Sequence, residues 1–121
     1  MIKTSPKEFD LTSIESIWCR DREDLTFFLD FGRDISSATH KLIVREFEWE
    51  FAHPSYLIDF GEKERTTFDE TDAANGIVKH TIDADTIEDW GSRKLVFFWQ
   101  CEESGVKWVA VDRTIYIGFG S

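Results

Sequence analysis

The stretch TDAANGIVKHTIDADTIEDWGSRKLVFFWQ, from Thr71 to Gln100, contains the signals that decide the fold. Its Asn75-Gly76 pair predicts a tight turn, because both residue types adopt positive φ angles at low cost. The run IVKHTI after this turn predicts a strand, and RKLVFFWQ at the end predicts a second strand that is apolar on both faces. The stretch contains no nucleophile motif, metal cage or phosphate-binding loop.

Between these two strands, DADTIEDWG predicts a single helical turn near residues 83–90. Asp83 or Asp85 is a suitable N-cap, and Gly91 is a suitable end. The segment is too short to be stable as an independent helix. We therefore expect it to close one end of the fold, with Trp90 as the side chain that fills that end.

The two-residue period continues on both sides of this stretch. The segments predicted as strands are Phe9–Trp18, DLTFFLDF, KLIVREFEWEF, YLIDF, a short edge strand around Thr66–Phe68, and VKWVAVDRTIYIGF. In DLTFFLDF the residues Leu25, Phe27, Leu29 and Phe31 share one face, and in the last segment Val109, Val111, Ile115 and Ile117 do so. The last two strands, joined by EESG, are predicted to form a central hairpin.

About seven or eight short strands with almost no helix indicate an all-β fold. Two packed antiparallel sheets are the simplest way to bury so many one-sided strands, and a small barrel is the competitor. A chain of 121 residues suits one domain, so we expect a single β-sandwich domain over residues 1–121.

The net charge of −10, from 24 acidic and 14 basic residues, predicts that the surface repels phosphate backbones and anionic membranes. We therefore expect no nucleic-acid partner and no membrane partner. The N-terminus lacks the apolar segment of a secretory signal, and no apolar run is long enough to span a bilayer. These features predict a soluble protein made in a cytoplasm.

Candidate reactive or metal-binding residues are few. Cys19 and Cys101 match no zinc or redox spacing, which favours two buried thiols; a disulfide between them is the alternative. His40, His53 and His80 lie far apart in the sequence, which predicts surface or strand residues and no shared metal site. His80, between Val78 and Ile82, is expected to be a partly buried imidazole with satisfied hydrogen bonds.

A group of carboxylates is the best candidate for function. If loops gathered these side chains at one end of the sandwich, they would suit Ca²⁺ or a basic partner, although their spacing is not that of an EF-hand; a solvated rim is the simpler interpretation. The group consists of Asp69, Glu70, Asp72, Asp83, Asp85, Glu88 and Asp89.

Five Trp and eleven Phe residues are expected mainly in the core, because most alternate with polar residues. Exposed, coplanar Trp rings would instead indicate a sugar-binding platform or a protein interface. No serine motif is present, and neither cysteine has a histidine nearby in the sequence. These observations predict no enzymatic activity, no catalytic residue, no metal and no cofactor.

The order of these signals resembles the small immunoglobulin-like domains of tailed-bacteriophage virion proteins, including the N-terminal domain of siphophage baseplate upper proteins. The resemblance rests on RDISSATHKLIVRE, where Asp34, Ile35, Ser36, Ala38 and Thr39 match and a strand arginine follows, and on the segment from DAANG through the closing hairpin. It covers nearly the whole chain as a loose pattern.

This resemblance implies an immunoglobulin-like sandwich and a non-enzymatic structural role in a virion, in the tail, baseplate, fibre adaptor or capsid decoration. The implied partners are other virion proteins in multiple symmetric copies, and the implied location is the virion after synthesis in the host cytoplasm. It supplies no catalytic residue. The alternative is a carbohydrate- or cell-surface-binding sandwich module, with calcium as a candidate aid.

Overall fold

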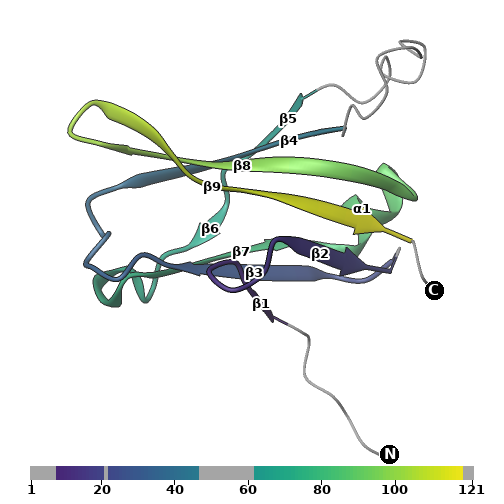
Figure 1. Cartoon of the computed structure of the whole chain (residues 1–121), viewed down its shortest axis with the longest axis horizontal. Coiled ribbons are helices and arrows are strands. Elements are labelled where there is room, and N and C mark those ends of the chain that lie inside the picture. The colour runs from purple at the N-terminus through teal and green to yellow at the C-terminus, as the bar shows by residue number, and fades with distance from the viewer. Residues whose placement is uncertain (1–7, 21, 47–61, 119–121) are drawn as a thin grey trace, which may run out of the picture.

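The computed structural model describes residues 8–20, 22–46 and 62–118. In these ranges the chain forms nine strands in two sheets, one α-helix and one 3-10 turn. The two sheets lie one above the other, with the helix at one end (Figure 1). The predicted all-β sandwich is therefore confirmed. YLIDF, the second half of KLIVREFEWEF, Trp49 and His53 lie outside the described residues.

The smaller sheet has four strands in the order β1-β3-β7-β6. These strands are β1 (Glu8–Asp10), β3 (Leu25–Asp30), β7 (Ile77–Ile82) and β6 (Phe68–Asp69). The strands predicted in DLTFFLDF and IVKHTI are thus both present, and they pair antiparallel along six residues.

The larger sheet has five strands in the order β2-β9-β8-β4-β5. They are β2 (Ser16–Cys19), β9 (Val106–Ile117), β8 (Arg93–Glu103), β4 (Thr39–Glu46) and β5 (Glu62–Arg65). The predicted hairpin of the last two strands is confirmed, and β8 occupies the middle of the sheet. The connection predicted to hold one edge strand instead holds two, because the chain passes from β5 in this sheet to β6 in the other.

The first predicted strand, Phe9–Trp18, is wrong as a continuous element. A turn interrupts it, in which the Asp10 carboxylate accepts a hydrogen bond from the Thr12 backbone N–H at 2.9 Å and the Asp10 carbonyl accepts one from the Ser13 N–H at 3.1 Å. The turn carries the chain from one sheet to the other and buries Leu11 completely. As a result β1 and β2 both join their sheets by parallel pairing, so the sandwich is not antiparallel throughout.

The helix α1 (Ala84–Trp90) confirms the predicted helical turn. Asp83 is its N-cap, with a side-chain oxygen 2.8 Å from the Thr86 N–H, and the Gly91 N–H bonds back to the Ile87 carbonyl. Trp90 is buried with 5% of its surface exposed, as expected of a side chain that closes the end of the core.

The turn before β7 differs from the prediction in detail. A 3-10 turn, Ala73–Asn75, precedes the glycine, and of the pair only Gly76 adopts a positive φ, of 86°. The Asn75 side chain instead donates to the Asp72 carboxylate at 2.7 Å.

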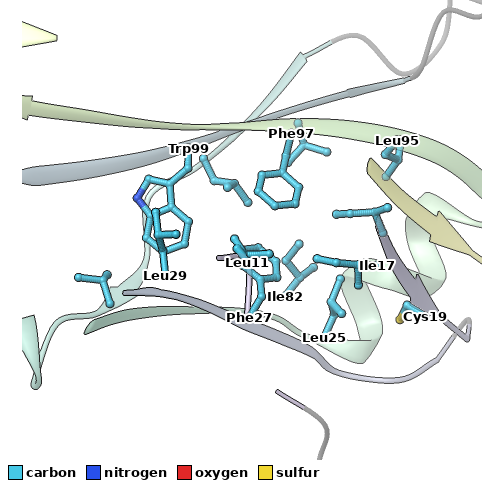
Figure 2. Close-up of a cluster of buried hydrophobic side chains, with 14 of the residues drawn as sticks. Leu11, Ile17, Cys19, Leu25, Phe27, Leu29, Ile82, Leu95, Phe97 and Trp99 are labelled. Atoms are coloured by element: carbon cyan, nitrogen blue, oxygen red, sulfur yellow. The ribbon is translucent and has the colours of Figure 1, made fainter. Parts of the chain in front are cut away.

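The core lies between the facing sides of the two sheets (Figure 2). Leu25, Phe27 and Leu29 of β3 point toward the larger sheet, which contributes Phe97 and Trp99 of β8. The Phe27 and Phe97 rings stack across the interior with centroids 4.9 Å apart. This contact fixes the spacing of the sheets at the centre of the sandwich.

The last strand contains an irregularity that alternation did not predict. Trp99 pairs with Val111 and Gln100 pairs with Val109, so Ala110 is an extra residue that forms a β-bulge. The bulge shifts the alternation by one residue and turns Val109 to the outside, where 52% of it is exposed. The prediction that Val109 shares a face with Val111, Ile115 and Ile117 is therefore wrong.

Candidate functional site

A histidine and a cysteine, two residue types that often act in catalysis or metal binding, lie together in one buried cluster at the end of the core. His40, near the start of β4, lies beside Trp99 and Cys101 of β8. Phe31 and Phe68 cover the imidazole ring from the other sheet, with ring centroids 5.7 and 5.5 Å from it. His40 is therefore a buried strand residue, which agrees with the predicted surface or strand position through its place in β4.

Hydrogen bonding assigns the tautomer of His40. The Trp99 indole Nε1–H donates to His40 Nδ1 at 3.0 Å, and an indole nitrogen can only donate. Nδ1 is therefore unprotonated, and the neutral ring carries its proton on Nε2. That atom lies 3.9 Å from Oε1 of Glu70, which is too far for a hydrogen bond. Burial is the main cause that lowers the pKa of His40, and the charges of Glu70 and Glu103 oppose it.

The Cys101 thiol lies next to a histidine, as a catalytic cysteine would, but it is not activated as a nucleophile. Its Sγ lies 3.4 Å from His40 Nδ1, the acceptor that Trp99 already occupies. Burial raises the pKa of Cys101 to about 11, and the charge of Glu103 adds to this effect. A reactive cysteine needs a thiolate near neutral pH, so this arrangement keeps the sulfur protonated and unreactive.

A concavity of about 220 Å³ lies next to this cluster, and His40 and Cys101 are among the residues that line it. Its other lining residues are Thr39 and Lys41 of β4, Gln100 and Glu102 of β8, and Lys107 of β9. These residues alternate with the buried His40 and Cys101, so their side chains leave the opposite face of the sheet. The concavity is therefore a polar feature of the outer surface.

His80 lies deeper in the core and lacks hydrogen bonds. Only 1% of its surface is exposed, and neither ring nitrogen has a hydrogen-bond partner among the described residues. Its strand neighbours are Phe27 of β3 and Phe68 of β6, whose rings contact it at centroid distances of 5.6 and 4.5 Å. Burial first, and the charge of Arg65 second, lower the pKa of His80 to about 4. The predicted satisfied, partly buried imidazole is therefore wrong.

The candidate acidic residues do not form one group. Asp69, Glu70 and Asp72 precede β7, whereas Asp83, Asp85, Glu88 and Asp89 follow it around α1. The six residues of β7 separate the two sets by roughly 20 Å.

Most of these carboxylates also have local partners. Asp69 accepts from the backbone N–H and hydroxyl of Thr71, and these bonds lower its pKa. Glu88 lies 3.8 Å from the Arg22 guanidinium. In the part of the chain that the structure describes, no three metal-ligating side chains come together. The condition for a calcium site, that loops gather the acids at one end, is therefore not met among the described residues.

The four described tryptophans divide between core and surface. Trp90 and Trp99 are buried, Trp108 is half-buried, and Trp18 is 54% exposed. The Trp18 ring stacks on Tyr116 of the neighbouring strand, with centroids 4.2 Å apart and planes 10° apart. This is one exposed aromatic pair, not the row of two or three tryptophan rings that the carbohydrate hypothesis requires.

Both cysteines are buried thiols that form no disulfide, which confirms the favoured prediction. Cys19 pairs with Ile117 at one end of β9, whereas Cys101 pairs with Trp108 near the other end. Nine residues of strand separate the two positions by roughly 30 Å, far beyond the about 7 Å Cα separation that a disulfide can bridge.

Two features that sequence reasoning missed lie at the β8–β9 end. The Arg33 guanidinium forms a bidentate salt bridge with the Glu103 carboxylate, which joins the loop after β3 to the end of β8. The outer edge of β9 from Val106 to Asp112 has no paired strand among the described residues. Both arise from contacts between distant parts of the chain, which no local pattern reports.

Comparison with protein-family models and with curated proteins finds no match. Among solved structures, the chain is similar to the N-terminal domain of phage TP901-1 ORF48. The TM-score is 0.41 and the sequence identity is 12%, over 91% of this chain and 93% of that chain.

Proposed function

We propose that this chain is a non-enzymatic structural component of a tailed-phage virion that acts through protein–protein contacts. The tail, the baseplate, a fibre adaptor and a capsid decoration are the positions that the sequence resemblance implies. The observation that carries the proposal is where the matching residues lie. Ile35 is fully buried and Ala38 is 4% exposed, so the residues of the resemblance shape a packed corner of the sandwich.

Hydrogen bonds make this corner rigid. The Asp34 carboxylate accepts from the backbone N–H of Ser36 at 2.9 Å and from its hydroxyl, and these bonds lower the pKa of Asp34. The Ile35 N–H donates to the Ala73 carbonyl at 3.0 Å, which ties the corner to the turn before β7. A corner held in this way supports a role as a rigid body that presents strands and loops to neighbours.

The buried cluster favours a structural role over catalysis. Its thiol is held protonated, its imidazole acceptor is occupied by Trp99, and its side chains are buried in the core. A catalytic group needs access to a substrate and a pKa matched to its task. The contacts around His40 and Cys101 instead provide packing between the sheets.

The proposed partners are other virion proteins, in multiple symmetric copies, and not nucleic acid or membrane. The charge of −10 supports the exclusion of phosphate-rich partners. Among the described residues, no helix has the length and apolar character needed to cross a bilayer. The proposed location is the virion, after synthesis in the host cytoplasm, and no cofactor or metal is required. An immunoglobulin-like class for the sandwich is part of the same proposal.

Mass spectrometry of virions purified from the phage that encodes this chain tests the proposal. We expect the chain in a constant ratio to the major tail or capsid protein, both before and after a high-salt wash. A nonsense mutation in its gene should yield particles that lack the chain and assemble or infect poorly. A host cytoplasmic protein followed through the same gradient is the control. A chain that is abundant in the infected lysate but absent from washed particles would refute the proposal.

A further inference from the structure

The strand β9 is covered along only part of its outer edge. β8 pairs with β9 on one side from Val106 to Ile117, whereas β2 pairs on the other side only from Thr114 to Ile117. Just before the residues that pair with β2, the Arg113 guanidinium donates to the carbonyls of Leu11 and Ile14, which lie between β1 and β2. From Val106 to Asp112, no described strand pairs with the backbone on this side.

This open edge carries apolar side chains in solvent. Val106 is 64% exposed and Val109 is 52% exposed, and they are two of the three large exposed hydrophobic residues in the described ranges. Figure 1 shows the β8–β9 hairpin at the end of the sandwich opposite the C-terminus. An exposed strand edge with apolar side chains is a template for pairing with another strand.

The bulge at Ala110 determines which side chains share a face along this edge. In a regular strand, Lys107 and Asp112 would point to opposite faces, because they are an odd number of positions, five, apart. The bulge removes this difference. Lys107 pairs with Glu102 of β8 and Asp112 pairs with Phe98, and these two partners lie on the face of β8 opposite to its buried residues. Lys107 and Asp112 therefore both lie on the outer face, and both are exposed.

We propose that this edge pairs antiparallel with the same edge of a second copy of the chain, about a two-fold axis between Val109 and Ala110. In this register Lys107 of each copy lies opposite Asp112 of the other, on the outer face. Trp108 lies opposite Val111 of the other copy, on the inner face. The pairing thus joins opposite charges twice and matches an aromatic ring with a β-branched residue twice, both of which are favourable cross-strand pairs.

The bulge also explains why a second copy fits this edge better than an unrelated strand. A bulge on one strand leaves two residues opposite one and disrupts pairing with a regular partner. In the two-fold arrangement each strand contributes the same extra residue at the same place. The numbers of residues on the two strands are then equal, so the pairs of Lys107 with Asp112 and of Trp108 with Val111 keep their faces on both sides of the axis. A two-fold contact of this kind is self-complementary, as closed symmetric assemblies require.

Neither charged side chain is neutralised elsewhere in the described structure. Lys107 and Asp112 form no ion pair with another described residue. Each is therefore available to the second copy. The inference rests on the proposed symmetric assembly for its biological setting, whereas the strand pairing follows from the edge alone.

Sedimentation velocity and light scattering, from micromolar to millimolar protein, test the pairing. We expect a reversible dimer for the native chain. Asp112→Lys should weaken it by at least about tenfold, because one substitution replaces two attractions with two repulsions. Lys107→Asp should act in the same direction, and the double variant Lys107→Asp/Asp112→Lys should restore the dimer. Glu64→Gln, on β5 at the other edge of the sheet, is the control and should leave dimerisation unchanged.

Hydrogen exchange provides a second readout, since amide protection between residues 107 and 112 should rise with protein concentration. Circular dichroism and the unfolding midpoint verify that each variant folds. A monomer at all concentrations would overturn the inference. So would a dimer that Asp112→Lys does not weaken, or one that the double variant fails to restore. None of these results affects detection of the chain in virions, so the two proposals fail separately.

Discussion

Lowering the pH from 7 to 4 is expected to remove about 3 kcal/mol of stability through His80 alone. His80 is 1% exposed, and neither ring nitrogen has a hydrogen-bond partner in the described part of the chain. Burial, with a smaller effect from the charge of Arg65, lowers its pKa to about 4. In the unfolded chain the imidazole has an ordinary pKa of about 6.5. Between these two values the unfolded state binds the extra proton, so protonation favours unfolding.

The direction follows from this difference in proton binding. The contribution of His80 is fully present above about pH 6.5 and decreases as the pH falls toward about 4, where protonation of the folded state begins to limit the loss. The difference between a pKa of about 6.5 in the unfolded chain and about 4 in the folded chain corresponds to about 3 kcal/mol, most of which is lost by pH 4. This is a large fraction of the stability of a domain of this size, which is about 5–15 kcal/mol.

Urea unfolding followed by tryptophan fluorescence at several pH values measures this effect. The matched variant is His80→Leu, which fills a similar volume, cannot titrate and leaves no polar atom unpaired. We expect it to be at least as stable as the native chain at pH 7 and to lose about 3 kcal/mol less between pH 7 and pH 4.

Comparing the native chain with the His80→Leu variant removes the contribution of the other groups that make the fold sensitive to acid. The lowered pKa values of His40, Asp69 and Glu103 also destabilise the fold in acid, but both proteins share these groups. Equal pH dependence of the two proteins would refute the reasoning. So would an NMR titration that gives His80 in the folded chain a pKa near 6.5.

Three further predictions follow from single contacts. Gly76→Ala should destabilise the fold by more than about 2 kcal/mol in urea unfolding, because the new Cβ would lie 2.6 Å from a backbone carbonyl oxygen and the residue would also have to adopt a positive φ. Gly105→Ala, where φ is positive but the space is open, should cost only about 1–2 kcal/mol, and equal losses for the two variants would argue against the clash. Asp83→Ala should cost about 1 kcal/mol through loss of the N-cap, whereas Asp85→Ala in the same turn should cost less, and the reverse order by thermal unfolding would contradict the cap assignment. Cys101 should resist alkylation at pH 8 in the folded chain and react once urea unfolds it, as peptide mass spectrometry can verify; rapid labelling of the native protein would contradict a buried thiol with a pKa of about 11.

Local sequence patterns correctly predicted the strands and the helix whose conformation depends mainly on their own residues. The alternation of DLTFFLDF places Leu25, Phe27 and Leu29 in the core, and the Asp83 cap and Gly91 end of α1 are legible in nine residues. The apolar character of β8 on both faces predicted its central place in the sheet. These signals act over a few residues, so a single sequence contains them in full.

Features that depend on distant contacts were missed. A bulge at Ala110 changes the alternation by one residue, and no residue type there marks it. The turn after Asp10 breaks a run that reads as one strand because Leu11 fills the core from the turn itself.

The candidate site was harder to predict for the same reason. Trp99 donates to His40 across 59 residues of sequence, and the strand β7 separates acids that lie close together in the sequence. The apolar rings around His80 come from two other strands. Which side chains meet is therefore decided by strand order, which local patterns do not contain.

The central claim is that the chain acts by contact as part of a virion. A cryo-EM map of the purified particle tests it most directly. We predict symmetric density into which the sandwich fits as a rigid body, with neighbouring protein against its strand edges. A map in which every density is accounted for by other proteins would contradict the claim.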